Sequence, residues 1–502
     1  MDQRKKSYAA QHTVPSLDGG TAHGAVSELS ENAQSAGNAA MEELRNLQAP
    51  AKGGTPVTDT DSTMVRGIHV HGMLAACLGS CAAGTTLGFA SAAMATIERE
   101  SWYNPATGDR WLADALLLGA AGGALLSGFP LWALGSRTTM LLCAVGLTAS
   151  WLLLASSTEL VALYAARVSC GAWLGLTTIG VSLYVAEVAP PEKRAFYTGL
   201  TEVATSTGIV ASYALAGLSW RQQATVWSVA PLGLLGAQGF LVESPRWLLL
   251  HGRRHDAETA AARLYGYDLP PELKRCKSPD EGATTTVPYA AQARRLSACL
   301  VLHLVQGSTC AHLFLYRGTQ VTQGLVAQLA APLAAAAITA VHAAFVVTFA
   351  FLTRAAGRRL LLCVSTLLVA FCFCVFPPFE HLVFRQWSAA ATRNDISWHA
   401  VYSVILLVLS YSVGLCHLPP LLTAELCSGP GLLHHMGASV AWSFRWMLAF
   451  LLLHFDRELL MIGRAVHAPL MLAVALMMTV GGLVAFLPET EGRTLGAIES
   501  GE

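Results

Sequence analysis

The chain has 502 residues, of which 53% are hydrophobic and only 13% are charged, and its formal net charge is zero. Soluble proteins usually carry about a quarter charged residues, and the mean hydropathy here is +0.47. A charge deficit of this size, together with apolar runs of about 20 residues, indicates a polytopic helical membrane protein. The balanced charge gives no reason to expect a nucleic-acid partner.

The first 65 residues form a polar stretch that is rich in Ser, Thr, Gly, Ala and Gln. They contain too few large apolar side chains to build a core, which predicts a disordered tail. Since no basic segment leads at once into a short apolar core, we expect no cleaved signal peptide. The first membrane span would then direct insertion.

Twelve apolar runs follow this tail, six on each side of a polar interval. The expected spans are 68–92, 111–134, 138–156, 160–187, 196–218, 225–241, 296–316, 325–352, 360–377, 399–422, 436–455 and 465–487. Helices satisfy the backbone within lipid, and a β-barrel would show alternation instead. The sequence therefore predicts an all-α membrane protein. Its parts are an N-terminal six-helix bundle at 66–242, a connector with short helices at 243–295, a C-terminal six-helix bundle at 296–487 and a tail at 488–502.

Arginine and lysine are unevenly divided between the two sides of the membrane. If the N-terminal tail is cytoplasmic, sixteen basic residues fall in the cytoplasmic turns, the connector and the C-terminal tail, against eight in the opposite loops. The positive-inside rule then places both termini and the connector in the cytoplasm. We expect an integral membrane protein, located in the plasma membrane.

The twelve cysteines predict neither a disulfide framework nor a metal site. Nearly all lie in or beside apolar runs, where small buried thiols are common. Cys372 and Cys374 are two residues apart, as are His69 and His71, and this spacing points side chains to different faces of a helix. No phosphate-binding loop, catalytic triad or zinc motif is present, so we expect no enzyme activity and no cofactor.

The two halves of the chain repeat three features. Each has a glycine-basic turn after its second span, a glutamate at the end of its fourth span and an acidic motif after its sixth. These features are Gly135 to Arg137, Glu187 and Glu243 to Arg246 in the first half, and Gly357 to Arg359, Glu425 and Pro488 to Arg493 in the second. Duplicated six-span units are typical of alternating-access carriers.

A set of motifs stands at the span ends in a fixed order. They are Arg167-x3-Gly171-x3-Gly175, the segment from Tyr184 through Glu187 to Arg194, Glu243-Ser-Pro-Arg246, Gly357-Arg358-Arg359 and Pro488-Glu489-Thr490-Glu491-Gly492-Arg493. This set resembles the sugar porter family of the major facilitator superfamily, the relatives of facilitative glucose and trehalose transporters. The resemblance covers nearly all of residues 68–496, and residues 80–94 look most like the arthropod branch. It implies twelve transmembrane helices in two bundles around a central site.

The resemblance also implies a cytoplasmic gate. Charged side chains at the span ends would pair with one another and with helix termini, and would lock the two halves together when the inner side is closed. Alternatively, some of these charges only face water at the membrane boundary. The expected gate residues are Glu187, Arg194, Glu243, Arg246, Arg358, Arg359, Glu425 and Glu489.

A sugar site built from amides and hydroxyls is the further implication, because such groups both donate and accept hydrogen bonds. The expected substrate-binding residues are Gln306, Glu202, Ser308, Thr309, His342, Tyr411, Ser412 and Trp446. Glu202 replaces a family glutamine, and Arg445 replaces an asparagine. A charge near the bilayer centre costs about 3 kcal/mol on insertion scales, so it normally faces a cavity or a partner.

These two charges leave two interpretations open. Glu202, His342 and Arg445 would line the central cavity and shift substrate choice away from plain glucose. The alternative is a structural Glu–Arg or Glu–His bond between the halves, or an arginine that reaches outward.

The residues of span one bear on whether transport is coupled to protons. Sugar symporters of this kind carry an acid in span one, where this chain has Thr85 and Thr86. Threonine favours a facilitative uniporter of a hexose, trehalose or related polyol, although Glu202 leaves symport open. The alternative function is a sugar sensor or a non-transporting paralogue, with a channel as a weaker option. The expected partners are a small-molecule sugar and membrane lipids.

Overall fold

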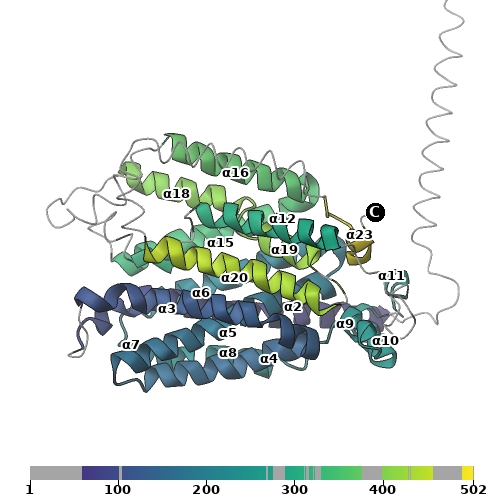
Figure 1. Ribbon diagram of the computed structural model, residues 1–502, viewed down its shortest axis with the longest axis horizontal. Coiled ribbons are helices and arrows are strands. Elements are labelled where there is room, and N and C mark those ends of the chain that lie inside the picture. The colour runs from purple at the N-terminus through teal and green to yellow at the C-terminus, as the bar shows by residue number, and fades with distance from the viewer. Residues whose placement is uncertain are drawn as a thin grey trace, which may run out of the picture. The chain divides into compact units, whose positions relative to one another are not determined.

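The computed structural model describes residues 59–100, 105–266, 269–274, 289–309, 311, 316–319, 322, 330–375, 398–427, 429, 431–455 and 489–500. The chain separates into Met1–Thr58 and Asp59–Glu502, and all described residues belong to the second unit. Their regular structure is helical, as predicted (Figure 1). The predicted N-terminal tail up to residue 58 and the whole of the span at 465–487 lie outside the described residues.

Helices account for all six predicted spans of the first half. They are α2 (Asp59–Ile97), α3 (Pro105–Leu126), α4 (Gly128–Ala155), α5 (Leu160–Val188), the 3-10 turn η1 (Pro191–Lys193), α6 (Arg194–Ala214), α7 (Trp220–Trp227) and α8 (Ala230–Gly236). The kink at Gly135 inside α4 separates the end of span two from span three. The sixth span is made of two pieces, α7 and α8.

The connector and the second half follow the predicted order. Their helices are α9 (Pro245–Leu250), α10 (Arg254–Tyr265), α11 (Pro271–Lys274), α12 (Tyr289–Ser308), α15 (Ala331–Ala356), α16 (Arg358–Val375), α18 (Trp398–Ser412), α19 (Leu418–Leu426), α20 (Leu432–His454) and α23 (Leu495–Ser500). Span ten is broken between α18 and α19. Pro419 and Pro420 lie in the first turn of α19, and proline cannot continue a helix from the preceding turn because it lacks the N–H donor. Helices α9, α10, α11 and α23 lie at one end of the bundle, the connector end (Figure 1).

Five helices among the described residues are long and apolar enough to cross a membrane. They cover Val70–Ile97, Gly128–Ala155, Leu160–Val188, Ala331–Ala356 and Leu432–His454. At 1.5 Å per residue, about 20 residues span the hydrocarbon core. Large exposed side chains on these helices, such as Phe129, Val161 and Leu433, are apolar, which suits contact with lipid.

Two long helix pairs provide the largest contacts between the halves among the described residues. α3 packs along α20, and α6 packs along α15. In each pair the second span of one half meets the fifth span of the other, which is the arrangement expected of a duplicated unit. Within the first half, Gly123 and Gly171 allow α3 and α5 to approach closely, because a Cβ on either would collide with a carbonyl oxygen of the other helix.

Candidate functional site

Two matching turns lie at the connector end. Gly135 and Gly357 have positive φ values of 82° and 77°, a conformation that favours glycine. In each turn a carboxylate accepts the backbone N–H two residues beyond the glycine, Glu243 Oε1 in the first half and Glu489 Oε2 in the second, both at 3.2 Å. A carboxylate there satisfies free N–H groups and the positive end of the helix dipole. Two of the three repeated features, the glycine turn and the acidic motif after the sixth span, therefore have matching geometry in the two halves.

The predicted gate residues of the α5–α9 region lie close together. Burial raises the pKa of the Glu243 carboxyl, and hydrogen bonds from the N–H groups of Arg137 and Ser244 oppose that rise. Glu187, at the end of α5, accepts a bond from the Ser244 side chain and interacts with the charge of Arg246. These contacts connect α5 with the turn inside α4 and with the start of α9.

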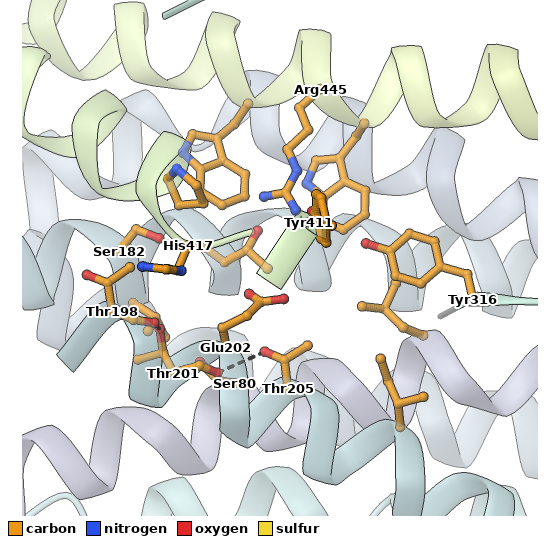
Figure 2. Close-up of a pocket in the computed structure, with 17 residues that line it drawn as sticks. Ser80, Ser182, Thr198, Thr201, Glu202, Thr205, Tyr316, Tyr411, His417 and Arg445 are labelled. Atoms are coloured by element: carbon orange, nitrogen blue, oxygen red, sulfur yellow. Dashed lines mark hydrogen bonds between the residues drawn. The ribbon is translucent and has the colours of Figure 1, made fainter. Parts of the chain in front are cut away.

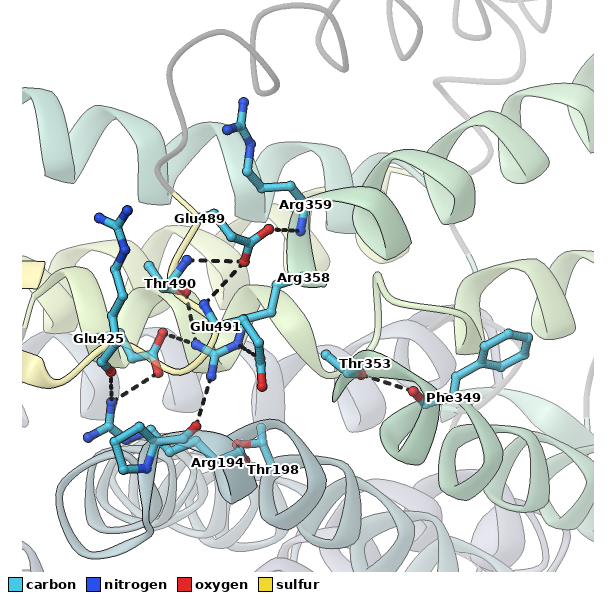
Figure 3. A network of polar contacts seen from close by, with 12 residues as sticks. Arg194, Thr198, Phe349, Thr353, Arg358, Arg359, Glu425, Glu489, Thr490 and Glu491 are labelled. Carbon is cyan, nitrogen blue, oxygen red and sulfur yellow. Dashed lines mark hydrogen bonds and ion pairs between the residues drawn. The ribbon is translucent and has the colours of Figure 1, made fainter. Parts of the chain in front are cut away.

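A second group of gate residues meets across the two halves (Figure 3). Arg194 Nη1 donates to Glu425 Oε1 at 3.5 Å, and Arg358 Nη1 donates to Glu425 Oε2. Arg358 Nε also binds Glu491 Oε2 at 2.6 Å. Glu425 is 1% exposed and Arg358 is 0% exposed. We call Arg194, Arg358, Glu425 and Glu491 the Glu425 cluster.

Backbone carbonyls complete the Glu425 cluster. Arg194 Nη1 donates to the carbonyl of Arg493 at 3.1 Å, and Arg358 Nη2 donates to the carbonyl of Pro191 at 3.4 Å. Each arginine therefore reaches a main-chain group of the opposite half. Charge-assisted bonds of this kind are among the stronger hydrogen bonds in proteins. Because the bonds cross the interface, they must break when the halves separate at the connector end.

A separate ionic cluster joins the halves at the opposite end. In α3, Asp114 Oδ1 accepts a hydrogen bond from Arg317 Nη2. The other carboxylate oxygen, Oδ2, lies 3.0 Å from His454 Nδ1. The Arg317 bond is also 3.0 Å long, and the same nitrogen donates to the carbonyl of Leu453 at 3.2 Å. We call Asp114, Arg317 and His454 the Asp114 cluster. Asp114 is absent from the predicted residues, although an acid inside an apolar run is a signal of function.

Hydroxyl contacts add to the closure at this end. Thr319 donates from its backbone N–H to Ser91 Oγ at 3.1 Å and from Oγ1 to the Ser91 carbonyl at 2.8 Å. The N–H of Gly318 donates to the Tyr213 hydroxyl at 3.2 Å. Both ends of the interface between the halves are therefore bridged.

A cavity of about 50 Å³ lies at the interface of the halves, midway along α6 and α20 (Figure 2). Along α6, the cavity residue Glu202 lies between Arg194 and Tyr213, which contact the other half at opposite ends. Along α20, Arg445 lies well before His454. The cavity is thus placed between the Glu425 cluster and the Asp114 cluster.

One face of α6 supplies a polar wall of this cavity. Thr198, Thr201, Glu202 and Thr205 recur at spacings of three and four residues, which aligns them on one helix face. The threonine hydroxyls donate to carbonyls within α6 at 2.7–3.0 Å. Their oxygen lone pairs remain able to accept hydrogen bonds from a ligand. The three threonines are absent from the predicted site, although their helical spacing is a readable signal.

Helix α20 supplies the facing wall. The Arg445 guanidinium lies 4.8 Å from the ring centroid of Trp442 and 5.4 Å from that of Trp446, a cation–π arrangement. Arg445 also forms a side-chain hydrogen bond with Tyr316. Figure 2 shows Arg445 and Glu202 pointing into the cavity from opposite sides.

Two buried nitrogen atoms at the cavity have no hydrogen-bond partner among the described residues. They are His417 Nε2 and Trp446 Nε1. Buried polar groups are nearly always paired, so each is suited to bind a ligand or a water molecule. A group of three or more His, Cys, Asp or Glu side chains that could hold a metal ion is not found in the described part of the chain.

Three of the predicted substrate residues line the cavity, namely Glu202, Tyr411 and Trp446. Arg445 lines it as well, which agrees with the interpretation that this side chain faces inward. The remaining predicted residues are not part of the cavity wall in this arrangement, and their contact with sugar stays a prediction.

Gln306 and His342 lie directly behind Tyr411. Gln306 Nε2 donates to the Tyr411 hydroxyl at 3.3 Å and to the carbonyls of Leu415 and Cys416 at 2.8 and 3.1 Å. The His342 ring stacks on the Tyr411 ring at 6.1 Å between centroids. The two side chains therefore position Tyr411.

The hydroxyl residues of the predicted set bind other protein groups. Ser412 Oγ lies 2.6 Å from His342 Nδ1. Ser308 and Thr309 donate to carbonyls three residues earlier in the chain, at 3.0 and 2.8 Å.

Residues 72–501 match the family model described as "Sugar (and other) transporter". The chain belongs to this family. The transporter is 27% identical over 487 residues to the facilitated glucose transporter member 8 of solute carrier family 2 from Bos taurus, which covers 91% of this chain and 98% of the relative. It is 24% identical over 465 residues to the facilitated trehalose transporter Tret1 of Drosophila virilis, which covers 89% of this chain and 50% of the relative. The transporter thus spans about half the length of that fly protein.

Solved structures show the same fold. The major facilitator superfamily proton:xylose symporter XylE, bound to 6-bromo-6-deoxy-D-glucose, superposes with a TM-score of 0.72 at 17% identity, covering 88% of the transporter and 99% of XylE. The inward open conformation of the xylose transporter XylE from E. coli superposes with a TM-score of 0.61 at 16% identity, and the match covers 85% of this chain and 98% of XylE. The predicted major facilitator fold, with twelve helices in two bundles, is confirmed. The family consists of membrane transporters rather than enzymes.

Proposed function

We propose that this protein is a facilitative sugar transporter that works by alternating access. One observation carries the proposal: a polar cavity lies at the interface of the two halves, with an inter-half ionic cluster on each side of it. Opening of either cluster would widen access to the cavity from that end. Binding would then shift the population between two open states.

The orientation and the gates are part of the same proposal. The connector end faces the cytoplasm, in keeping with the excess of basic residues there, and the plasma membrane is the proposed location. The Glu425 cluster is then the inner gate, and the Asp114 cluster is the outer gate. The domain boundaries remain those expected from hydropathy, at 65, 242, 295 and 487.

A hexose, trehalose or related polyol is the proposed substrate. Carboxylate, guanidinium, phenol and hydroxyl groups around the cavity offer both donors and acceptors to sugar hydroxyls. Uniport is supported by span one, where threonine stands in place of the acid of sugar symporters. Thr85 and Thr86 both donate to the Ala82 carbonyl at 2.8 Å. The buried Arg167 donates to the carbonyl of Thr86 at 3.4 Å.

Uptake of radiolabelled glucose, fructose, trehalose and inositol into proteoliposomes tests the proposal, with protein-free liposomes as the control. We expect a saturable flux of at least one sugar, counterflow, and no change when a protonophore dissipates the proton gradient. Specific binding without flux would support a sensor instead. Flux without counterflow would indicate a channel, and a flux that collapses with the proton gradient would indicate symport.

A further inference from the structure

The cavity contains one carboxylate and one guanidinium, and they come from different halves. Glu202 projects from α6 of the first half and Arg445 from α20 of the second (Figure 2). The two charges interact electrostatically, but no direct ion pair joins them among the described contacts. The other residues that line the cavity include no further Asp, Glu, Lys or Arg.

Arg445 is held in place by its neighbours. Its guanidinium lies against two indole rings and bonds to the Tyr316 side chain. These contacts direct it into the cavity and reduce its freedom to fold down onto Glu202. The space between the two charged groups is therefore the space that a ligand would enter.

We propose that Glu202 and Arg445 form a charge-compensated pair that selects ligands without net charge and excludes carboxylated sugars and amino sugars. The inference rests on the proposed transport function and adds a rule of selectivity to it. A hydroxyl of a neutral polyol would donate a hydrogen bond to Glu202, and another would accept a hydrogen bond from Arg445. Both fixed charges would then keep a partner when water is displaced.

A singly charged sugar cannot bind both fixed charges favourably. A carboxylated sugar could bind Arg445 but would bring a second negative charge near Glu202, and an amino sugar would meet the reverse problem at Arg445. In either case the cavity would hold a net charge in a poorly hydrated place, which is strongly unfavourable. The neighbouring His417, Tyr316 and Tyr411 carry no permanent charge that would offset it.

The origin of the two groups in different halves connects selectivity to closure. A ligand can contact Glu202 and Arg445 at the same time only when the halves are close together. The neutral ligand therefore stabilises the closed arrangement, whereas a charged one binds one half only and does not favour closure.

Uptake of three sugars with the same ring tests the selectivity directly: D-glucose, D-glucuronate and D-glucosamine. The variants are Glu202→Gln, Arg445→Gln and the double variant, which removes both charges and is the matched control. We expect the wild type to prefer glucose at least tenfold over both charged sugars. Glu202→Gln should gain glucuronate uptake, Arg445→Gln should gain glucosamine uptake, and the double variant should gain neither. Uptake of a charged sugar by the wild type as readily as glucose would overturn the proposal, as would unchanged preferences in single variants that still carry glucose.

A thermal double-variant cycle tests the pair without any sugar. Glu202 and Arg445 are both partly buried. Each single variant leaves one of these charges uncompensated, so each should lower the melting temperature of the purified protein, and the double variant should recover part of the loss. Additive losses would overturn the pairing. A wild type that carries no sugar in any assay would defeat the proposed transport function, while this cycle would still decide the pairing of the charges.

Discussion

The two ionic clusters close the same interface at opposite ends, but they differ in their permanent charges. In the Glu425 cluster one buried carboxylate is shared by two arginines, and a further carboxylate and two backbone carbonyls complete the network. In the Asp114 cluster one buried carboxylate is shared by one arginine and one histidine. Arginine keeps its charge at all physiological pH values, and histidine does not. We infer that the connector end is the more firmly closed of the two, and the substitutions below test this difference.

Arg358→Ala should have the largest effect. It removes the bonds to Glu425 and Glu491 and leaves a buried carboxylate poorly compensated, a loss of about 3–5 kcal/mol for a buried pair. The halves should then separate more readily at the connector end. We expect a lower melting temperature and faster labelling by a maleimide of Cys427, which is 7% exposed and follows α19.

The exposed Arg354 at the end of α15 provides the matched control. Arg354→Ala removes the same side chain near the same end and should leave both readings close to the wild type. Equal effects of the two substitutions would contradict the importance of the cluster.

Gly135→Ala should destabilise the connector end by about 3 kcal/mol, since its backbone lies in a region that is almost restricted to glycine. The added Cβ would also lie 2.7 Å from the Glu243 carboxylate. Gly357→Ala has similar backbone strain, but its Cβ would meet Glu489 at 3.3 Å. The melting temperature should therefore fall less for Gly357→Ala than for Gly135→Ala, and the opposite ranking would contradict this prediction.

Asp114→Asn should weaken the opposite end by about 2 kcal/mol, because the bonds to Arg317 and His454 lose their ionic character. We expect a smaller loss of melting temperature than for Arg358→Ala and an altered rate of sugar uptake. Glu159→Gln is the control, since Glu159 is an exposed acid just before α5. If Asp114→Asn exceeded Arg358→Ala, the proposed ranking of the two ends would be wrong.

Thr319→Val should have the smallest effect. The substitution keeps the shape of the side chain but removes the Oγ1 contacts with the carbonyl and the hydroxyl of Ser91, and a hydrogen bond of this kind is worth about 1 kcal/mol. A small decrease in melting temperature, measured beside Thr207→Val on an exposed part of α6, would confirm that the hydroxyl contacts are secondary to the Asp114 cluster. A decrease as large as that of Asp114→Asn would reverse this order.

The span ends were predictable because a charge beside an apolar run is conspicuous. The family resemblance placed Arg194, Arg358 and Glu425 at a gate, and the structure brings their side chains together. Which charges would pair across the halves was not predictable, because nothing local connects Asp114 with Arg317. The role of Glu491 was not predictable for the same reason. Glu491 forms the ion pair with the Arg358 side chain, whereas Glu489 accepts hydrogen bonds from backbone N–H groups of its own half.

The cavity was less predictable than the gates. Its walls depend on how each apolar helix is rotated, and a helix that is apolar on every face carries little information about rotation. Gln306 illustrates the problem. The break between α18 and α19 frees the carbonyls of Leu415 and Cys416, and the amide bonds to them behind the cavity wall. Glu202, in contrast, was detectable from the cost of burying a charge.

The repeated joints at Gly135 and Gly357 have a consequence for how such a molecule can move. In each half, the carboxylate that follows the sixth span binds the backbone at the start of the third span. Neither hydrogen bond crosses to the other half. Rocking of the two halves leaves these hydrogen bonds intact, while the bridging clusters break and reform. Each half can therefore pivot without breaking the bond between its sixth and third spans.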